Sequence, residues 1–365
     1  MEEILKVNLG ESSYPIYIGS DNLRTIGGRL RSLLATNKVR VITNPTVWSL
    51  YGSTIKTSFE GSDISFEVFE IPDGEEYKSL RVASDLFERL AVSQALRFEP
   101  IVALGGGVVG DLAGFVAATY MRGVPLIQVP TTLLAQVDSS VGGKVAVNLA
   151  AGKNLVGAFY QPRFVLIDVS TLKTLPEREL KAGLAEVIKV AFLKGDDFLS
   201  YLTANMKDIV NLKEETPLRI IRESCEFKAR VVEEDERDLT GKRAILNYGH
   251  TVGHAIESLT GYKEYLHGEA VALGLVAAAL ISKRLGLIDE ALLDLHYSIL
   301  RSASFSVKLP SSISHEDILR AISLDKKRKG QGMVFVLLRD VGQPFVAEVD
   351  EETVKRALEE MRVSG

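Results

Sequence analysis

The chain has 365 residues, of which 46% are hydrophobic and 25% charged, and this length predicts about two domains. The formal net charge of −5 argues against a general binder of nucleic acid or of membrane surfaces, and no apolar run approaches the roughly 18 residues of a membrane span. The single cysteine, Cys225, fits a reducing compartment, and the acidic N-terminus does not look like a secretory signal, so we expect a cytoplasmic protein.

The first half of the chain alternates short β-rich runs with segments of helical periodicity. The predicted strands are Tyr14–Ile18, Val39–Thr43, Ile64–Ile71, Ile101–Leu104, Leu126–Val129 and Phe164–Val169. The predicted helices are Asp21–Ala35, Pro45–Phe59, Ser79–Ser93 and Asp111–Met121. This alternation is typical of an α/β layer with a largely parallel sheet, which we assign to residues 1–170.

The pattern changes after about Asp168. Pro176 and the acids that follow it predict the start of a helix, and helical periodicity dominates from there to Ser306. Two short apolar runs within Met333–Val349 flank a glycine and a proline and predict a hairpin. Residues 171–365 are therefore predicted to form a second, mostly helical domain.

A glycine-rich segment, Gly105–Gly110, follows a predicted strand and precedes a helix. That context favours phosphate binding, because free N–H groups and the helix dipole attract anions. The acid expected about 20 residues further on in a standard dinucleotide site is missing, and Thr131 and Thr132 stand there instead. The segment is thus either a variant nucleotide site or a tight turn without a ligand.

A second glycine-rich stretch, residues 138–154, carries Lys144 and Lys153, each directly after a glycine. Lysine next to closely approaching backbone often holds a phosphate. A flexible surface loop with solvated lysines explains the pattern equally well, so spacing alone leaves both interpretations open.

Three of the five histidines fall close together in sequence. His250 and His254 share one helix face, and His267 begins another apolar helix. Glu186, on the predicted helix 180–193, is a natural carboxylate partner. A catalytic zinc usually has three such ligands and an open position. Spacing does not choose three of these four groups, and buried structural histidines with a surface glutamate are the alternative.

Other polar residues near this set carry less information individually. Lys189 lies three residues after Glu186 and can face the same direction, and Arg243 and Asn247 precede His250. For each of them, and for Lys228 and the charged run 325–329, a solvated helix face is an adequate explanation. His296 and His315 are predicted to be structural or solvated.

Four motifs together resemble the 3-dehydroquinate synthase family over nearly the whole chain. They are Pro72–Ser79, Gly105–Phe115, Gln128–Lys144 and Asn247–His254. The resemblance implies an α/β Rossmann-like NAD-binding domain followed by a helical metal-binding domain, and a homodimer in the cytoplasm. It implies a divalent metal, zinc or cobalt, on Glu186, His250 and His267. One departure is Asn44, where family members often carry Asp for the adenosine ribose.

The resemblance also implies the remaining site residues. NAD contacts are expected at Asn44, Glu75, Lys78, Gly106, Gly107, Val108, Asp111, Thr131, Thr132, Leu134, Asp138, Lys144, Lys153, Thr174 and Leu175. Catalytic roles are expected for Asp138, Lys144, Lys189, Lys228, Asn247 and His254, and further substrate contacts for Arg122, Asn154, Arg243 and Lys326.

The implied reaction converts 3-deoxy-D-arabino-heptulosonate 7-phosphate to 3-dehydroquinate and phosphate. Its steps are transient NAD-dependent oxidation, phosphate elimination, re-reduction, ring opening and intramolecular aldol closure. The alternatives are another sugar phosphate cyclase or a metal- and NAD-dependent polyol dehydrogenase of the same fold. No nucleic acid or membrane partner is expected.

Overall fold

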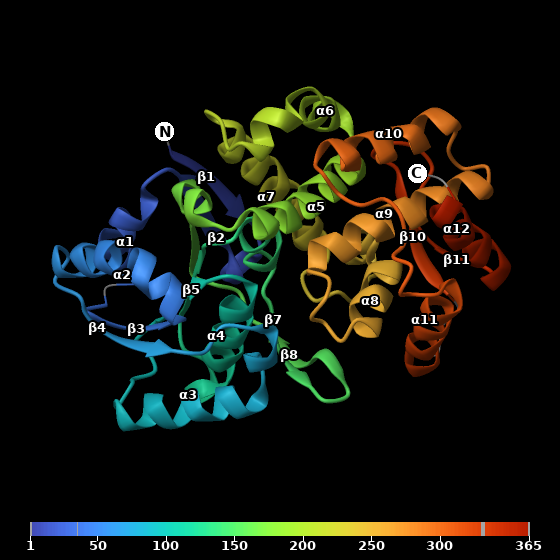
Figure 1. Cartoon of the computed structure of the whole chain (residues 1–365). Coiled ribbons are helices and arrows are strands. Elements are labelled where there is room, and N and C mark those ends of the chain that lie inside the picture. Colours follow the sequence, from blue (N-terminus) through green and yellow to red (C-terminus); the bar gives the residue numbers. More distant parts are fainter. Residues whose placement is uncertain (1, 35, 330–332, 364–365) are drawn as a thin grey trace. The chain divides into compact units, whose positions relative to one another are not determined.

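A computed structural model describes residues 2–34, 36–329 and 333–363 (Figure 1). The chain forms two compact units. The first contains Met1–Leu175 and Lys228–Arg237, and the second contains Pro176–Phe227 and Asp238–Gly365. The α/β class of the first unit and the helical character of the second confirm the predicted fold class.

The first unit is built on a seven-stranded sheet with the order β1-β2-β9-β6-β5-β3-β4. All neighbouring strands are parallel except β1, which pairs antiparallel with β2. A separate antiparallel hairpin, β7–β8, lies outside this sheet. The bounds are β1 Glu2–Val7, β2 Tyr14–Gly19, β3 Lys38–Thr43, β4 Ser65–Glu70, β5 Ile101–Gly105, β6 Leu126–Pro130, β7 Lys144–Leu149, β8 Gly152–Phe159 and β9 Phe164–Asp168.

Four helices cover the two faces of this sheet. They are α1 Ile26–Leu34, α2 Pro45–Glu60, α3 Leu80–Val92 and α4 Gly107–Thr119. Alternate residues of β3 separate the two cores, because Val39 and Val41 pack with α1 and α2 whereas Ile42 packs with α3 and α4. The sheet is therefore buried on both faces, as the continuous apolar strands predict.

The strand order reverses between β3 and β5. β4 extends the sheet on one side of β3, and β5, β6 and β9 extend it on the other. In open α/β sheets, ligands bind outside the carboxyl ends of the strands at such a switch point. Here those ends are Thr43 and Gly105, so the fold places the glycine-rich segment at the expected ligand position.

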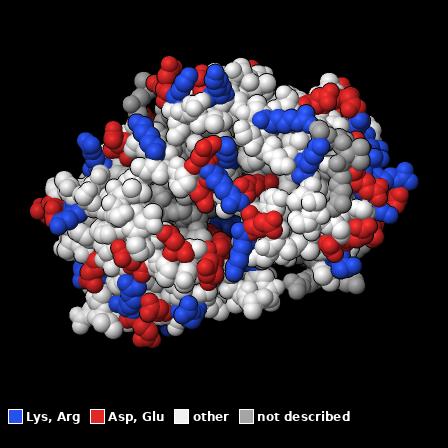
Figure 2. Space-filling view, in the orientation of Figure 1, with Lys and Arg blue, Asp and Glu red and all other residues white. Residues whose placement is uncertain are grey.

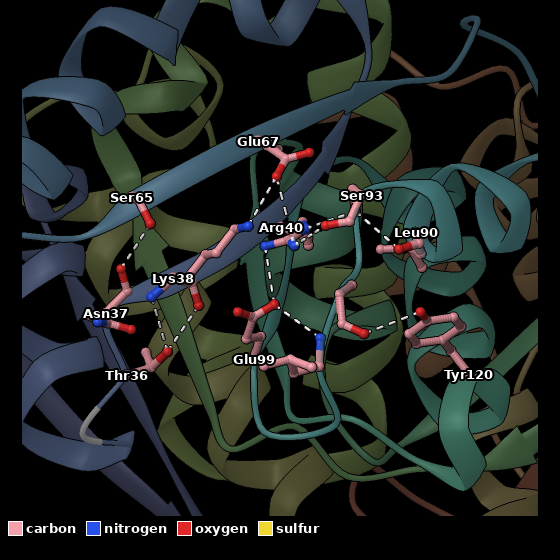
Figure 3. Close-up of polar contacts among 12 residues, drawn as sticks. Thr36, Asn37, Lys38, Arg40, Ser65, Glu67, Leu90, Ser93, Glu99 and Tyr120 are labelled. Carbon is pink, nitrogen blue, oxygen red and sulfur yellow. Dashed lines mark hydrogen bonds and ion pairs between the residues drawn. The ribbon is translucent and has the colours of Figure 1, made fainter.

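A buried ion-pair cluster occupies the part of the sheet near the amino end of β3 (Figure 3). Arg40 is fully buried, and its guanidinium lies 3.2 Å from Glu99 and 3.7 Å from Glu67. It also donates hydrogen bonds to the carbonyl oxygen and the hydroxyl of Ser93, at 3.0 and 3.2 Å. Buried charge is thus neutralised within the unit, away from the glycine-rich segment.

The second unit is mostly helical and closes with a small hairpin. Its helices are α5 Glu177–Lys194, α6 Asp196–Val210, α7 Thr216–Glu234, α8 His250–Leu259, α9 His267–Arg284, α10 Glu290–Ser302, α11 His315–Lys329 and α12 Glu351–Val363. The C-terminal part of α7 belongs to the first unit. The strands β10 Val334–Leu338 and β11 Pro344–Glu348 pair antiparallel, which confirms the predicted hairpin. Across the described residues, no helix is both long and apolar enough to cross a membrane.

The helix α9 is the centre of this unit, because it packs against α5, α8, α10 and α12. Two of its glycines allow very close backbone approach. A Cβ atom on Gly268 would lie 1.9 Å from the carbonyl oxygen of Ala182 in α5, and one on Gly274 would lie 1.8 Å from that of Gly249 before α8. No side chain fits at either position, so α5, α8 and α9 meet backbone to backbone.

Candidate functional site

A carboxylate and two imidazoles from three helices converge inside the second unit. Glu186 comes from α5, and His250 and His267 are the first residues of α8 and α9. The Nε2 atoms of His250 and His267 lie 3.5 and 3.4 Å from Oε1 of Glu186. One ligand atom from each residue lies within 4.8 Å of the others, so the group has the dimensions of a metal site.

Outer partners hold the other nitrogen of each imidazole. Nδ1 of His250 lies 3.2 Å from the carbonyl oxygen of Tyr248, and Nδ1 of His267 lies 3.1 Å from Oε2 of Glu257. Acceptors at Nδ1 favour a proton there, so Nε2, which faces Glu186, is the nitrogen of each ring that can bind a metal. Both rings are thus presented as metal ligands.

The carboxylate of Glu186 is 1% exposed, and its oxygens lack hydrogen bonds within the described part of the chain. Among the described residues, neither of its oxygens accepts a hydrogen bond, although Lys189 forms an ion pair with it. Burial raises the pKa of Glu186, but Lys189, His250 and His267 outweigh burial and hold that pKa well below its ordinary value. A buried, ionised carboxylate with unsatisfied oxygens is suited to a cation.

The two histidines differ in charge. Burial, reinforced by Lys189, lowers the pKa of His250 to about 3, so this ring is neutral. Burial also lowers the pKa of His267, but the flanking carboxylates of Glu186 and Glu257 outweigh it and raise that pKa to about 10. A proton on His267 therefore balances the two carboxylates. One carboxylate and two imidazoles form a donor set that suits zinc or cobalt, so the residues present fit such an ion.

His254 lies beside this cluster and is exposed on α8. Its ring centroid is 5.2 Å from that of His250 and 6.0 Å from that of His267. In a second group, His254, Glu257 and His267, one ligand atom from each residue also lies within 4.8 Å of the others. The Glu186 group is the more buried of the two.

A hydrogen-bonded pair, Tyr248 and His296, supports the cluster next to His250. The hydroxyl of Tyr248 lies 2.9 Å from Nε2 of His296, whose Nδ1 is 2.7 Å from the carbonyl oxygen of Leu292. His296 is fully buried and stacks on Phe192 with the ring centroids 3.7 Å apart. The prediction that His296 is structural agrees with this placement, and the pair anchors the residue whose carbonyl faces His250.

In the first unit, the glycine-rich segment joins β5 to α4. Gly106 is the N-terminal capping residue of α4, which begins at Gly107, four residues earlier than the sequence predicted. A Cβ on Gly106 would lie 3.0 Å from the methyl group of Thr132, and one on Gly107 would lie 3.2 Å from the Ser139 hydroxyl. The helix N-terminus is thus bordered by the segment that follows β6, which includes Thr131 and Thr132.

Charged and polar residues surround this turn. Lys78, which is buried, lies 2.5 Å from Asp111 of α4. Burial raises the pKa of Asp111, and Lys78 opposes that effect. Glu75 accepts a hydrogen bond from Asn148 at 2.8 Å and lies 3.8 Å from Lys153 of β8. The hairpin β7–β8 therefore contacts the segment 75–78. The sequence alone leaves this stretch as either a phosphate-binding segment or a flexible surface loop.

Lys228 and Asp138 form a second contact within the first unit. The Nζ atom of Lys228 lies 2.6 Å from both the carboxylate and the backbone carbonyl of Asp138. Lys228 is in the C-terminal part of α7, which explains how a residue distant in sequence reaches the segment after β6.

Three of the predicted residues sit in distinctive local structure. Asn44 caps α2 by accepting from the Val47 N–H at 2.8 Å, and its amide donates to Asp73. Arg122 lies in a left-handed segment, with φ of 48° at Met121 and 63° at Arg122. Asn154 has φ of 56° and donates its backbone N–H to Asn148 at 2.9 Å. Backbone of this kind in non-glycine residues often marks functional segments.

The remaining predicted residues are placed as follows. Thr174 contacts the hydroxyl of Tyr51 and is followed by Leu175, whereas Val108 lies in the first turn of α4 and Leu134 follows β6. Lys144 begins β7 and is exposed. In the second unit, Arg243 and Asn247 lie in the short helix Lys242–Asn247. Lys326 belongs to α11, and its side chain is outside the described part of the structure.

The site residues therefore form two separate groups, each within one unit. Glu186, Lys189, His250, His254 and His267 belong to the helical unit, and the glycine-rich segment with its neighbours belongs to the α/β unit. Acidic and basic side chains are interspersed over the face in view (Figure 2). Sequence reasoning missed Glu257 and Tyr248. Glu257 lies seven residues after His250, and that spacing on one helix face was a usable signal.

Comparisons with known proteins identify the family. Residues 68–182 match the family described as 3-dehydroquinate synthase N-terminal, and residues 183–328 match 3-dehydroquinate synthase C-terminal. The 3-dehydroquinate synthase of Desulforamulus reducens (strain ATCC BAA-1160 / DSM 100696 / MI-1) is 51% identical over 340 residues, or 93% of this chain and 94% of the relative.

Solved structures with a similar fold include two that hold ligands. The 2-deoxy-scyllo-inosose synthase complexed with carbaglucose-6-phosphate, NAD+ and Co2+ has a TM-score of 0.89 and 29% identity, covering 98% of this chain and 100% of that one. The 2-epi-5-epi-valiolone synthase of Streptomyces hygroscopicus subsp. jinggangensis 5008 with NAD+ and Zn2+ has a TM-score of 0.88 and 25% identity, covering 97% and 98%. The fold is that of the sugar phosphate cyclases.

Within that class, the sequence comparison is specific. The chain belongs to the 3-dehydroquinate synthase family, as the sequence motifs predicted.

Proposed function

We propose that this chain is an NAD- and divalent-metal-dependent lyase that converts 3-deoxy-D-arabino-heptulosonate 7-phosphate to 3-dehydroquinate and phosphate. The observation that carries the proposal is the buried Glu186–His250–His267 group with Lys189 beside it. The relative that is 51% identical over 93% of the chain supports the choice of reaction.

In this proposal, Glu186, His250 and His267 hold the metal, and the segment from Gly106 to Asp111 holds the dinucleotide phosphates. When bound, the ion supplies a Lewis acid and NAD supplies a reversible acceptor for the electrons of the alcohol oxidation. The unsatisfied oxygens of Glu186 support the first assignment. The glycine turn at the switch point and its closeness to Thr132 support the second.

The chain's own residues then have separate tasks. Lys189 is a buried cation beside Glu186, and with Arg243 it supplies positive charge for the leaving phosphate. His254 is exposed next to the cluster and is assigned to proton transfer at the substrate, with Asn247 as a hydrogen-bonding partner. The carboxylate of Asp138, which forms an ion pair with Lys228, keeps the Lys228 ammonium in position within the first unit.

The remaining assignments follow the family resemblance. Lys144, Arg122 and Asn154 are proposed substrate contacts in the first unit, and Lys326 in the second. Glu75, Lys78, Val108, Thr131, Leu134, Lys153, Thr174 and Leu175 are proposed NAD contacts, together with Asn44. The N-cap role of Asn44 leaves its amide, and not a carboxylate, to face a ribose.

A turnover assay tests the function. The purified protein is mixed with the heptulosonate phosphate, Zn2+ or Co2+, and NAD+ well below the substrate concentration. Many equivalents of phosphate and of dehydroquinate per NAD+ are expected, because the cofactor is regenerated in each cycle. Stoichiometric NADH formed from glycerol or another polyol, without phosphate release, would instead assign the chain to the polyol dehydrogenases. Turnover of a different sugar phosphate alone would assign it to another cyclase.

We also propose that the protein is a cytoplasmic homodimer. The family resemblance supports the dimer, and the single, buried cysteine supports a reducing compartment. Light scattering across a range of protein concentrations tests the dimer, and fractionation of the native cells tests the location.

A further inference from the structure

His267 is held between two carboxylates. Its Nε2 atom lies 3.4 Å from Glu186 and its Nδ1 atom lies 3.1 Å from Oε2 of Glu257. Glu257 is 3% exposed and comes from α8, two turns after His250. The same short helix therefore carries one proposed metal ligand and the outer partner of another.

We propose that Glu257 is a positioning residue for the metal centre. Its carboxylate accepts the Nδ1–H of His267, which sets the tautomer and the ring orientation so that Nε2 faces Glu186. A carboxylate in this position also makes the imidazole a stronger donor to a metal. This inference rests on the proposed metal site and adds to it the group that orients one of its three ligands.

The competing role for Glu257 is that of a direct ligand. Glu257, His254 and His267 form a group whose ligand atoms also lie within 4.8 Å of one another. An ion there would leave the two buried oxygens of Glu186, neither of which accepts a hydrogen bond from a described residue, without a metal. Burial of an ionised carboxylate without such compensation is costly, so the geometry favours the outer role.

The two roles predict different responses to substitution. Glu257→Gln keeps an oxygen that can accept the Nδ1–H, whereas Glu257→Ala removes the acceptor. If Glu257 positions His267, the Ala variant weakens metal binding by roughly 10- to 100-fold, the range seen for outer partners of metal ligands, and the Gln variant weakens it less. If Glu257 is a ligand, both variants weaken binding to a similar and larger extent.

The experiment is a titration of Co2+ into the metal-free, full-length protein, followed by its visible absorption. The variants are E257A, E257Q, H254Q and E186Q, and the control E290Q removes an exposed carboxylate of α10 in the same unit. Thermal unfolding of each metal-free variant by circular dichroism checks that it folds. We expect the Co2+ spectrum of E257Q to keep the wild-type band positions, and E257A to bind more weakly with shifted bands. E290Q and wild type are expected to match.

Three outcomes would overturn the inference. Wild-type affinity and spectrum in E257A would show that the carboxylate does not act on the metal centre. Equal losses in E257Q, E257A and H254Q, with E186Q unaffected, would place the ion on the other group. Failure of the wild-type protein to bind Co2+ would refute the metal part of the proposed function together with this inference, and would be distinguished from the other two because it does not depend on any variant.

Discussion

Two buried charged clusters, one in each unit, differ in how many atoms of the central charged group form hydrogen bonds: among the residues that the structure describes, two of the three guanidinium nitrogens of Arg40 donate one, whereas neither carboxylate oxygen of Glu186 accepts one. In the first unit, the Arg40 guanidinium faces Glu99, Glu67 and two oxygens of Ser93. In the second unit, Glu186 is equally deep, yet neither of its oxygens accepts a hydrogen bond from any described residue. Both clusters are low in exposure and rich in charge, so burial alone does not separate them.

The difference distinguishes structural charge from charge reserved for a ligand. Buried polar groups in folded proteins are normally hydrogen-bonded, and each exception requires an explanation. Arg40 links β3 to the segment after α3 near the amino end of the strand, where α/β sheets do not bind ligands. Glu186 pairs with Lys189 but accepts no hydrogen bond from the described residues, and two imidazole nitrogens point at it. The mark of the functional cluster is therefore a buried carboxylate that accepts no hydrogen bond within the described structure and faces two imidazole nitrogens, and not charge density.

The largest expected effect comes from removing the unsatisfied carboxylate. Glu186→Gln is predicted to weaken Co2+ or Zn2+ binding by more than the roughly 100-fold that outer partners contribute, because it neutralises a direct ligand. Phosphate release from the substrate should be lost with it. Isothermal titration of the metal-free protein measures the affinity, and retention of wild-type affinity would contradict the assignment of the cluster.

Removing the arginine of the Arg40 cluster should act on stability instead. Arg40→Met is predicted to lower the apparent free energy of unfolding by about 3–5 kcal/mol, because Glu99 stays buried without its cation. Urea denaturation monitored by circular dichroism measures this loss. A second variant, R40M with Glu99→Leu, should recover most of it, and metal affinity should be unchanged in both. A loss confined to metal affinity would reverse the distinction between the clusters.

The buried His296 ring predicts how the stability of the protein depends on pH. Burial lowers the pKa of His296 to about 4 from an ordinary value of 6.5, so the folded protein favours the neutral ring. Its contribution to stability is complete above pH 6.5 and is lost as the pH falls from 6.5 toward 4, because the unfolded chain takes up the proton first. Between pH 7.5 and pH 5, this amounts to about 2 kcal/mol.

The variant His296→Gln isolates that contribution. Urea denaturation at the two pH values should show a smaller loss of stability for H296Q than for the wild-type protein, since the variant has no imidazole to protonate at this position. Equal losses in the two proteins would mean that other groups account for the pH dependence and that the buried Tyr248–His296 pair is not held in the neutral state.

The smallest effect is expected at the exposed edge of the Arg40 cluster. Glu67 lies 3.7 Å from the guanidinium, and its side chain is 42% exposed. Solvent screens such a pair, so Glu67→Gln should change the free energy of unfolding by less than about 1 kcal/mol. The same urea experiment measures it. A loss as large as that of R40M would show that the cluster depends on Glu67 and not on Glu99.

Sequence patterns predicted the parallel strands well and the hairpins unevenly. The six predicted strands of the main sheet all exist, because each is a short apolar run bounded by turn residues. β1 was missed because its apolar residues, Ile4, Leu5 and Val7, do not alternate regularly with polar ones, and β7–β8 because the glycines and lysines in and around it suggested a loop. Such an antiparallel pair depends on contacts made elsewhere, including that of Asn148 with Glu75.

The sequence predicted which residues belong to the candidate site, but not which nitrogen of each histidine faces a metal. Clustering of scarce histidines pointed to a metal on three of the four groups Glu186, His250, His254 and His267, and only the family resemblance chose Glu186, His250 and His267. The choice depends on which nitrogen of each ring is occupied, and the acceptors that occupy them, the Tyr248 carbonyl and Glu257, come from folding and not from the local pattern. The return of Lys228 to the first unit likewise has no local sequence signal.

The backbone contacts at Gly268 and Gly274 limit how this site can change during evolution. Elsewhere in a core, a lost methyl group can be replaced by a larger neighbour. Between α5, α8 and α9 there is no such adjustable layer, since carbonyl oxygens already occupy the place of any side chain at these two glycines. The distances between these three helices are therefore fixed together. A change in the preferred metal ion has to come from exchanging the ligands or their outer partners, and not from moving the helices apart.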